Sequence, residues 1–253
     1  MNKRRVTGQP WVPQGNPLRA RWSGGAFGRH RLDSKLLILF LVMAIAAIGL
    51  LWLASEVFEG DNFAFDRAIL LAMRRQRDLA IPIGPHWLES VMLSITNLGG
   101  GTTLTLIVVV VCGALIASRK PAMAALVAAS SALGIGLSLI LKTLFLRPRP
   151  EIVPHLVSVS SSSFPSGHSM NSAVVYLTLA ILQARAVEGR ALQVYLLCSA
   201  VTLVVLIGLS RIYLGVHWPS DVLFGWGVGA AWAALSSLAA KSLQRRKAVE
   251  QPD

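Results

Sequence analysis

The chain has 253 residues, of which 54% are hydrophobic and 14% are charged, and its formal net charge is +12. Soluble domains normally contain about 25% charged residues, so this composition excludes an ordinary soluble enzyme. The charges are also clustered, which leaves long uncharged stretches between them. Together these features predict an integral membrane protein with one membrane-embedded domain.

The N-terminal segment, residues 1–35, contains eight Lys and Arg residues and a single acidic residue, Asp33. Gly, Pro and Trp recur in it without periodicity, which predicts a basic, disordered tail. An orientation signal beside anionic lipid explains such a tail better than a nucleic-acid site does. We therefore expect a cytoplasmic tail with the bilayer as its partner and no nucleic acid. The sequence does not predict the oligomeric state.

Residues 36–240 are dominated by apolar stretches that are typical of membrane helices. The expected spans are residues 36–54, 102–117, 122–141, 170–184, 194–209 and 222–240. The predicted fold is therefore all-α and polytopic, a bundle of about six transmembrane helices. A short cytoplasmic tail, residues 241–253, would follow. Residues 65–75 have apolar side chains at helical spacing, which predicts an amphipathic helix on the membrane surface.

Small residues recur at a spacing of four within two of these spans. Ser130, Gly134 and Ser138 lie in the third span, and Gly225 and Gly229 lie in the sixth. A stripe of small residues lets membrane helices approach one another closely. These two faces are therefore expected to pack against neighbouring helices.

Six spans place both termini on the same side of the membrane. The basic turns at residues 119–120 and 185–190 share that side, which by the positive-inside rule is the cytoplasm. We therefore expect a multi-pass protein of the bacterial cytoplasmic (inner) membrane. Four cations fall on the opposite, outer face against this rule, and chemistry is the obvious reason for them. They are Lys142, Arg147, Arg149 and Arg211.

One polar segment on that outer face, residues 210–221, holds a cation, an imidazole and a carboxylate. Pro219 fits the first position of a helix, where its missing N–H has no partner in any case. Asp221 would then lie in the first turn, close enough to hold the ring of His217. A carboxylate on one ring nitrogen fixes the tautomer and leaves the other nitrogen free to attack or to take a proton.

Two further segments on the outer face offer groups that bind anions. In residues 142–150, Lys142 supplies a point charge and Arg149 a planar fork suited to phosphate oxygens. In residues 164–168, Ser166 adds a hydroxyl, and Gly167 lets a ligand approach a helix start with free N–H groups. Each segment alone has an ordinary explanation, as snorkelling cations or as a turn. Together with two histidines they provide what phosphoryl transfer requires.

These segments resemble the three motifs of the type 2 phosphatidic acid phosphatase (PAP2) superfamily of membrane lipid phosphatases. Lys-x6-Arg-Pro is present as Lys142 to Pro150, and Pro-Ser-Gly-His as residues 165–168. Ser-Arg-x5-His-x3-Asp is present as residues 210–221. The order and spacing of the motifs match as well, and the six-helix layout extends the resemblance over about residues 36–240.

The resemblance implies a role for each motif residue. His217 would be the nucleophile that forms a phosphohistidine, with Asp221 orienting it, and His168 would be the general acid and later the base for water. The residues that would hold the phosphoryl oxygens are Lys142, Arg149, Ser166, Gly167 and Arg211. The residues alone leave open which histidine attacks, although the carboxylate partner favours His217.

No metal and no cofactor are expected, because a two-metal phosphatase needs several bridging carboxylates. The motif segments supply only Glu151 and Asp221. The two histidines would need opposite charge states, one neutral to attack and one protonated to donate, which predicts a bell-shaped pH dependence.

The expected activity is hydrolysis of a membrane lipid phosphate or diphosphate at the outer membrane border. Undecaprenyl diphosphate, phosphatidic acid and phosphatidylglycerol phosphate are the substrates that the resemblance implies. One alternative is a lipid phosphotransferase that passes the phosphoryl group to a lipid such as lipid A. Another is an anion or lipid transporter, although the middles of the spans carry no charge. Vanadium haloperoxidases share the motif set but are soluble, which excludes them.

Overall fold

The computed structural model describes residues 34–59 and 63–245. By its internal contacts the chain divides into two units, residues 1–42 and 43–253. Helix α1 (Ser34–Glu59) crosses this division, and all later elements belong to the second unit. Most of the tail predicted for residues 1–35 and the last part of the predicted C-terminal tail lie outside the described residues, so both predictions stay as they are.

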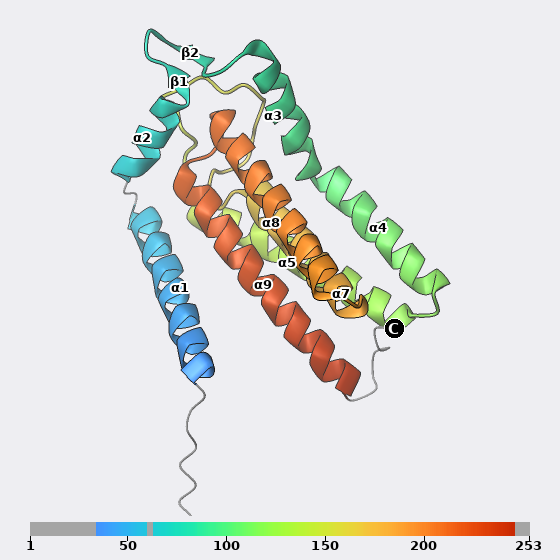
Figure 1. Ribbon diagram of the computed structural model, residues 1–253. Coiled ribbons are helices and arrows are strands. Elements are labelled where there is room, and N and C mark those ends of the chain that lie inside the picture. The colour runs from blue at the N-terminus through green and yellow to red at the C-terminus, as the bar shows by residue number, and fades with distance from the viewer. Residues whose placement is uncertain (1–33, 60–62, 246–253) are drawn as a thin grey trace, which may run out of the picture. The chain divides into compact units, whose positions relative to one another are not determined.

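Helices dominate the second unit, and the all-α prediction is confirmed. After α1 the chain forms α2 (Ala64–Ala72), β1 (Arg74–Arg75), β2 (Asp78–Pro82), α3 (His86–Leu98), α4 (Gly101–Ala117), α5 (Pro121–Phe145), α6 (Gly167–Ser172), the π-helix η1 (Ala173–Leu177), α7 (Thr178–Ala186), α8 (Arg190–Tyr213) and α9 (Pro219–Arg245) (Figure 1). Within the described part of the chain, the antiparallel β1–β2 hairpin is the one piece of β-structure, and the sequence did not predict it.

The described residues do not confirm the predicted number of six membrane spans. Three helices, α5, α8 and α9, are each long and apolar enough to cross a membrane. The bent pairs α1–α2 and α3–α4 raise the number to five if each pair counts as one span. The predicted fourth span is covered by α6, η1 and α7 in succession, and each of these pieces is too short to cross alone. Six spans are therefore not confirmed for the described residues, whereas a multi-pass membrane protein is.

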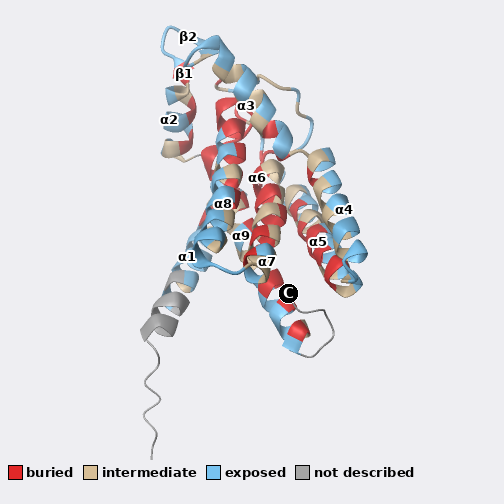
Figure 2. Cartoon of the chain, turned by 45° about the vertical axis from the view of Figure 1, so that its right-hand side comes forward, coloured by how far each residue is buried: buried red, intermediate tan, exposed pale blue. Residues whose placement is uncertain are grey.

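Helix α9 lies at the centre of the packing, in contact with α5, α6, η1, α7 and α8. Figure 2 shows the buried residues gathered along α5, α6 and α9, while α4 is largely exposed. The small-residue stripes form these contacts, as the sequence predicted. The Ser130 hydroxyl lies 2.7 Å from that of Ser236 on α9, and a Cβ added at Gly229 would come within 2.5 Å of the Ala173 Cβ.

The β1–β2 hairpin changes the prediction made for residues 65–75. The helix ends at Ala72 instead of continuing to Arg75, and the chain turns into β1. Arg74 is buried, and its guanidinium donates to the backbone oxygens of Tyr213 at 2.8 Å and of Pro154 at 3.5 Å. These distant carbonyls, which no local pattern shows, hold Arg74 inside the protein.

Gly215 makes room for this anchor, and we expect Gly215→Ala to destabilise the protein. Its φ of +75° lies in the left-handed region, and an added Cβ would stand 2.7 Å from Arg74 Nη2. The backbone strain alone costs about 1–2 kcal/mol in any residue other than glycine. The thermal midpoint of the purified variant in detergent should fall below that of Gly136→Ala, where an added Cβ meets nothing within 4 Å. Equal midpoints would contradict this account.

Candidate active site

The three motif segments meet at one end of the bundle, where α5 and α8 end and where α6 and α9 begin (Figure 1). The backbone N–H of Ser166 donates to the Asp221 carbonyl at 3.2 Å, which joins the second motif to the third. Arg149 Nη1 lies 3.3 Å from His217 Nε2, which joins the first motif to the third. The structure therefore brings together segments that are far apart in the sequence.

The Asp221 carboxylate holds the His217 ring in one orientation. Oδ2 of Asp221 lies 3.3 Å from Nδ1 of His217 and also accepts the backbone N–H of Trp218 at 2.9 Å and the hydroxyl of Ser163. An ionised carboxylate can only accept, so Nδ1 carries the ring proton. Nε2 faces Arg149, whose guanidinium can only donate, so Nε2 carries the lone pair. The nitrogen that can act as a nucleophile therefore points toward a cation suited to phosphate.

The imidazole of His217 is 1% exposed. Burial lowers its pKa to about 4, and the cations Arg149 and Arg211 act in the same direction against the bond to Asp221. Burial also lowers the pKa of the Arg149 guanidinium, against the attraction of Asp221. His217 is consequently neutral at physiological pH, which is the state that a nucleophile needs.

Lys142 and Arg149 hold backbone carbonyls of the loop that joins α5 to α6. Lys142 Nζ donates to the Ser162 oxygen at 2.8 Å, and Arg149 Nε donates to the Ser161 oxygen at 2.8 Å. Arg149 Nη1 also donates to the carbonyl of Val216. These carbonyl oxygens carry partial negative charge and accept hydrogen bonds from the two cations, as phosphoryl oxygens would.

The remaining predicted residues lie around the same point. Arg211 is buried and donates to the Thr96 hydroxyl at 2.8 Å, while its Nε has no hydrogen-bond partner among the described residues. His168 lies within electrostatic reach of Arg211, His217, Lys142 and Arg149. A Cβ at Gly167 would stand 3.3 Å from the Cε of Lys142, so the small residue leaves that lysine room beside α6.

Ser166 has a second function as the N-cap of α6. Its Oγ accepts the Ser169 hydroxyl at 2.9 Å and the Ser169 N–H at 3.5 Å. Because a hydroxyl also carries one donor proton, Ser166 can cap the helix and still donate to a phosphoryl oxygen. The structure thus gathers all eight residues that the sequence indicated at this end of the bundle.

Two charged residues at this end were not predicted as part of the site. Arg147 lies between two buried carboxylates, 2.7 Å from Asp221 Oδ1 and 3.1 Å from Asp66 Oδ2. Asp66, on α2, also accepts the backbone N–H of Ser220 at 2.7 Å and the Ser220 hydroxyl. The sequence signal for Arg147 was its place on the outer face against the positive-inside rule. Asp66 gave no signal, because a lone carboxylate on an amphipathic helix is ordinarily solvated.

The charges at this end suit a phosphate. Four cations and two carboxylates lie at this end, so their net charge is +2 in the ordinary ionisation states. They are Lys142, Arg147, Arg149 and Arg211 on one side and Asp66 and Asp221 on the other. A phosphoryl group with two negative charges would balance this excess. A buried site also strengthens each electrostatic contact, because water does not screen it.

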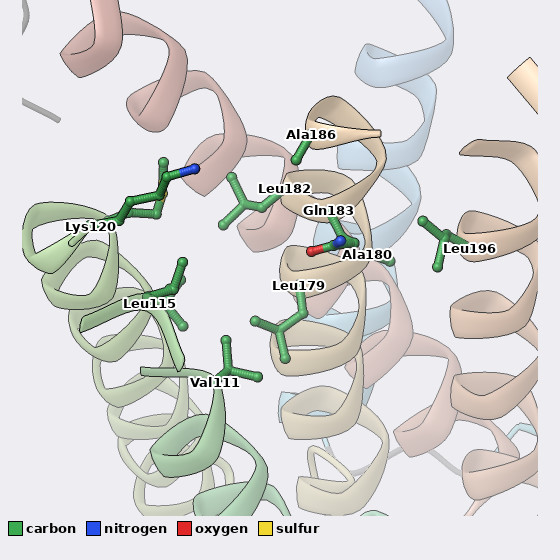
Figure 3. A pocket seen from close by; sticks show the side chains of 11 residues that line it. Val111, Leu115, Lys120, Leu179, Ala180, Leu182, Gln183, Ala186 and Leu196 are labelled. Atoms are coloured by element: carbon green, nitrogen blue, oxygen red, sulfur yellow. The ribbon is translucent and has the colours of Figure 1, made fainter. Parts of the chain in front are cut away.

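The groove shown in Figure 3 lies away from this site. It has a volume of about 320 Å³ and is lined mainly by aliphatic side chains from α4, α5, α7 and α8. Lys120, at its rim, stands 22 residues before Lys142, which corresponds to about 33 Å along a helix. The groove therefore belongs to the opposite end of the bundle, and its apolar lining offers no chemistry.

The fold and site define a multi-pass helical membrane protein in which buried cations and two histidines gather at one end of the bundle. A model of the PAP2 superfamily matches residues 122–245, which contain every predicted site residue. The chain belongs to the PAP2 superfamily, as its sequence motifs indicated, and it is a phosphatase of that family.

Relatives of known activity and structure support this assignment. Phosphatidylglycerophosphatase B of Bacillus subtilis is 37% identical over 59% of this chain and 74% of its own length. An undecaprenyl-diphosphatase of Sulfolobus acidocaldarius is 29% identical over 43% of this chain and 44% of its own length. The crystal structure of a transmembrane PAP2-type phosphatidylglycerolphosphate phosphatase from Bacillus subtilis, 30% identical, superposes with a TM-score of 0.70 over 80% of this chain and 98% of its own.

The pKa of His217 predicts the acid side of the pH profile. Protonation removes the lone pair of Nε2, so kcat/KM should stay level down to about pH 5 and fall about tenfold per unit below pH 4. The lipid phosphate titrates as well. Its own pKa is measured by phosphorus NMR in the same micelles, and kcat/KM is corrected for the fraction of substrate in each ionisation state. An acid limb at 6.5, the ordinary value for histidine, would contradict the buried, neutral His217.

Proposed function

We propose that this phosphatase hydrolyses lipid phosphates or diphosphates through a phosphohistidine on His217. The observation that carries the proposal is the orientation of the His217 ring, with Nδ1 held by Asp221 and Nε2 facing Arg149. A phosphoryl group bound by Arg149, Lys142 and Arg211 would lie in front of the Nε2 lone pair. His168, within electrostatic reach of the same cations, would stand on the side of the departing oxygen.

The reaction then proceeds in two steps. Nε2 of His217 attacks phosphorus and forms the N–P bond while the P–O bond to the lipid breaks, and the proton of His168 passes to the departing oxygen. Neutral His168 next takes a proton from water, whose oxygen attacks the phosphohistidine. The N–P bond breaks, inorganic phosphate leaves, and both histidines return to their starting states.

The names of the relatives guide the choice of substrate. They act on phosphatidylglycerophosphate and on undecaprenyl diphosphate, which both place a phosphate or diphosphate at the membrane border. We therefore propose these two lipids as the first substrates to test, with phosphatidic acid as the third. The bilayer supplies the substrate, and the buried cations recognise the phosphate that the three lipids share.

We further propose that the site opens on the outer side of a bacterial cytoplasmic membrane and that both termini are cytoplasmic. The basic turns at residues 119–120 and 185–190 lie at the far ends of α5 and α8 from the histidines. A cytoplasmic position for these turns follows the positive-inside rule and leaves the site on the opposite face.

Phosphate release from a panel of purified lipids tests the proposed reaction. The full chain in detergent should hydrolyse phosphatidylglycerophosphate or undecaprenyl diphosphate, and rapid acid-free quenching with labelled lipid should trap a phosphoenzyme. His217→Ala should form no phosphoenzyme and lose activity by about 10⁴-fold or more, as removal of a nucleophile does elsewhere. His168→Ala should lose most turnover. A labelled enzyme in His217→Ala would assign the nucleophile to another residue.

We expect activity to persist without divalent metal. Among the described residues, no group of three or more His, Cys, Asp or Glu could hold a metal ion. Asp66 and Asp221 are both engaged by Arg147, and cations occupy the positions where metal ions would stabilise charge. Turnover in excess EDTA should equal turnover in untreated buffer. Loss of activity that one added metal restores would overturn this expectation.

A further inference from the structure

Arg147 contacts the carboxylate that holds the His217 ring. Its Nη1 donates to Asp221 Oδ1 and to the Ser220 hydroxyl, both at 2.7 Å, and its Nη2 donates to Asp66 Oδ2 at 3.1 Å. The guanidinium carbon stands 5.4 Å from the centre of the Trp218 ring. Arg147 is thus the link between Asp66 on α2 and the carboxylate that holds His217.

The two carboxylate oxygens of Asp221 have different hydrogen-bond partners, and this arrangement depends on the link. Oδ1 accepts from Arg147, whereas Oδ2 accepts from His217, Trp218 and Ser163. An arginine fork prefers to take both oxygens of a carboxylate in two parallel hydrogen bonds. That arrangement would place an arginine nitrogen on Oδ2, where the imidazole now lies. The second arm of Arg147 is held away from Asp221 because it donates to Asp66.

Asp66 is itself firmly placed. Its side chain is 0% exposed, and its Oδ1 accepts the backbone N–H of Ser220 in the first turn of α9 at 2.7 Å. A carboxylate at this place also interacts favourably with the positive end of the α9 dipole. Asp66 therefore caps the helix that carries Asp221, although it comes from α2, before residues 122–245 that the family model matches.

We propose that Asp66 is a positioning residue for His217: by holding one arm of Arg147, it prevents that arginine from taking both oxygens of Asp221 and leaves Oδ2 free to orient the imidazole. The inference rests on the proposed phosphohistidine mechanism. Its chemistry is that of a three-part relay, Asp66 to Arg147 to Asp221, in which no member except Asp221 touches the nucleophile.

Asp66→Asn is the direct test, because it keeps the size of the side chain and an oxygen for the Ser220 N–H but removes the charge that holds Arg147. In the full chain in detergent, kcat and the rate of phosphoenzyme formation should fall by about 10²-fold, the usual effect of a misplaced reacting group. The inhibition constant of inorganic phosphate should stay within about twofold, since Lys142, Arg149 and Arg211 are unchanged. Asp78→Asn, an exposed carboxylate on the hairpin that caps Ala80, is the matched control and should keep full activity.

Two results with Asp66→Asn would overturn the inference. Wild-type kcat would do so, with or without a lowered thermal midpoint, because a merely structural Asp66 gives that pattern. Weaker inhibition by phosphate in parallel with kcat would instead place Arg147 among the phosphate ligands. If Asp66→Asn does not fold, Ser220→Ala, which removes the hydroxyl shared by Asp66 and Arg147, should lower kcat by about 10-fold, and an unchanged kcat there would equally overturn the inference.

A double-mutant cycle separates this inference from the proposed function. In an Asp221→Asn background, Asp66→Asn should cause no further loss, because the relay ends at Asp221. An equal loss in both backgrounds would show that Asp66 acts by another route. If the wild-type protein itself releases no phosphate from any lipid of the panel, the proposed function fails. An active wild type together with an Asp66→Asn variant of unchanged kcat refutes the positioning role alone.

Discussion

The contact on which this structure depends is the guanidinium of Arg147 between the carboxylates of Asp66 and Asp221. Both carboxylates are fully buried, and burial costs each of them several kcal/mol of hydration free energy. One shared cation offsets that loss for both. The same contact joins α2, the loop after α5 and the start of α9, so the stability of this end of the bundle and the geometry of the nucleophile have a common origin.

Electrostatics at the site are organised before any substrate arrives. The helix ends deliver the cations and the histidines to one place, and burial of His217 keeps its ring neutral. Fixed charges in a water-poor site do not need to reorganise during the reaction, which is the main electrostatic advantage that enzymes have over water. Under the proposed function, Lys142, Arg149 and Arg211 would do what metal ions do in other phosphatases.

The sequence was sufficient to predict the membrane class and the helical bundle, and to indicate eight residues that the fold gathers at one end, because these depend on local composition and on motifs with fixed spacing. It was insufficient where a residue acts through a distant partner. Asp66 has the appearance of a solvated residue on an amphipathic helix, and only the fold brings Arg147 and Ser220 to it. Arg74 belongs to a helical sequence pattern, yet α2 ends at Ala72. The Arg74 guanidinium instead donates to the Tyr213 carbonyl in the interior.

The predicted number of six spans is not confirmed for a related reason. Hydrophobicity shows where a chain can enter a bilayer, but it does not show where a helix breaks or bends. The pair α3–α4 bends by 48°, and α6 passes into α7 through a π-helical turn. Both irregular places lie beside elements that pack against α8, which suits the view that such breaks occur at functional regions of helices.

If Lys142 and Arg149 hold the phosphoryl group as proposed, their hydrogen bonds to the carbonyls of Ser161, Ser162 and Val216 have a consequence for the end of each catalytic cycle. When inorganic phosphate leaves, the backbone oxygens accept hydrogen bonds from the two cations in its place, so neither cation is left without a partner. Exchange of one set of acceptors for another keeps the net gain from holding the product small. Tight recognition of the reacting group and ready turnover are thereby made compatible.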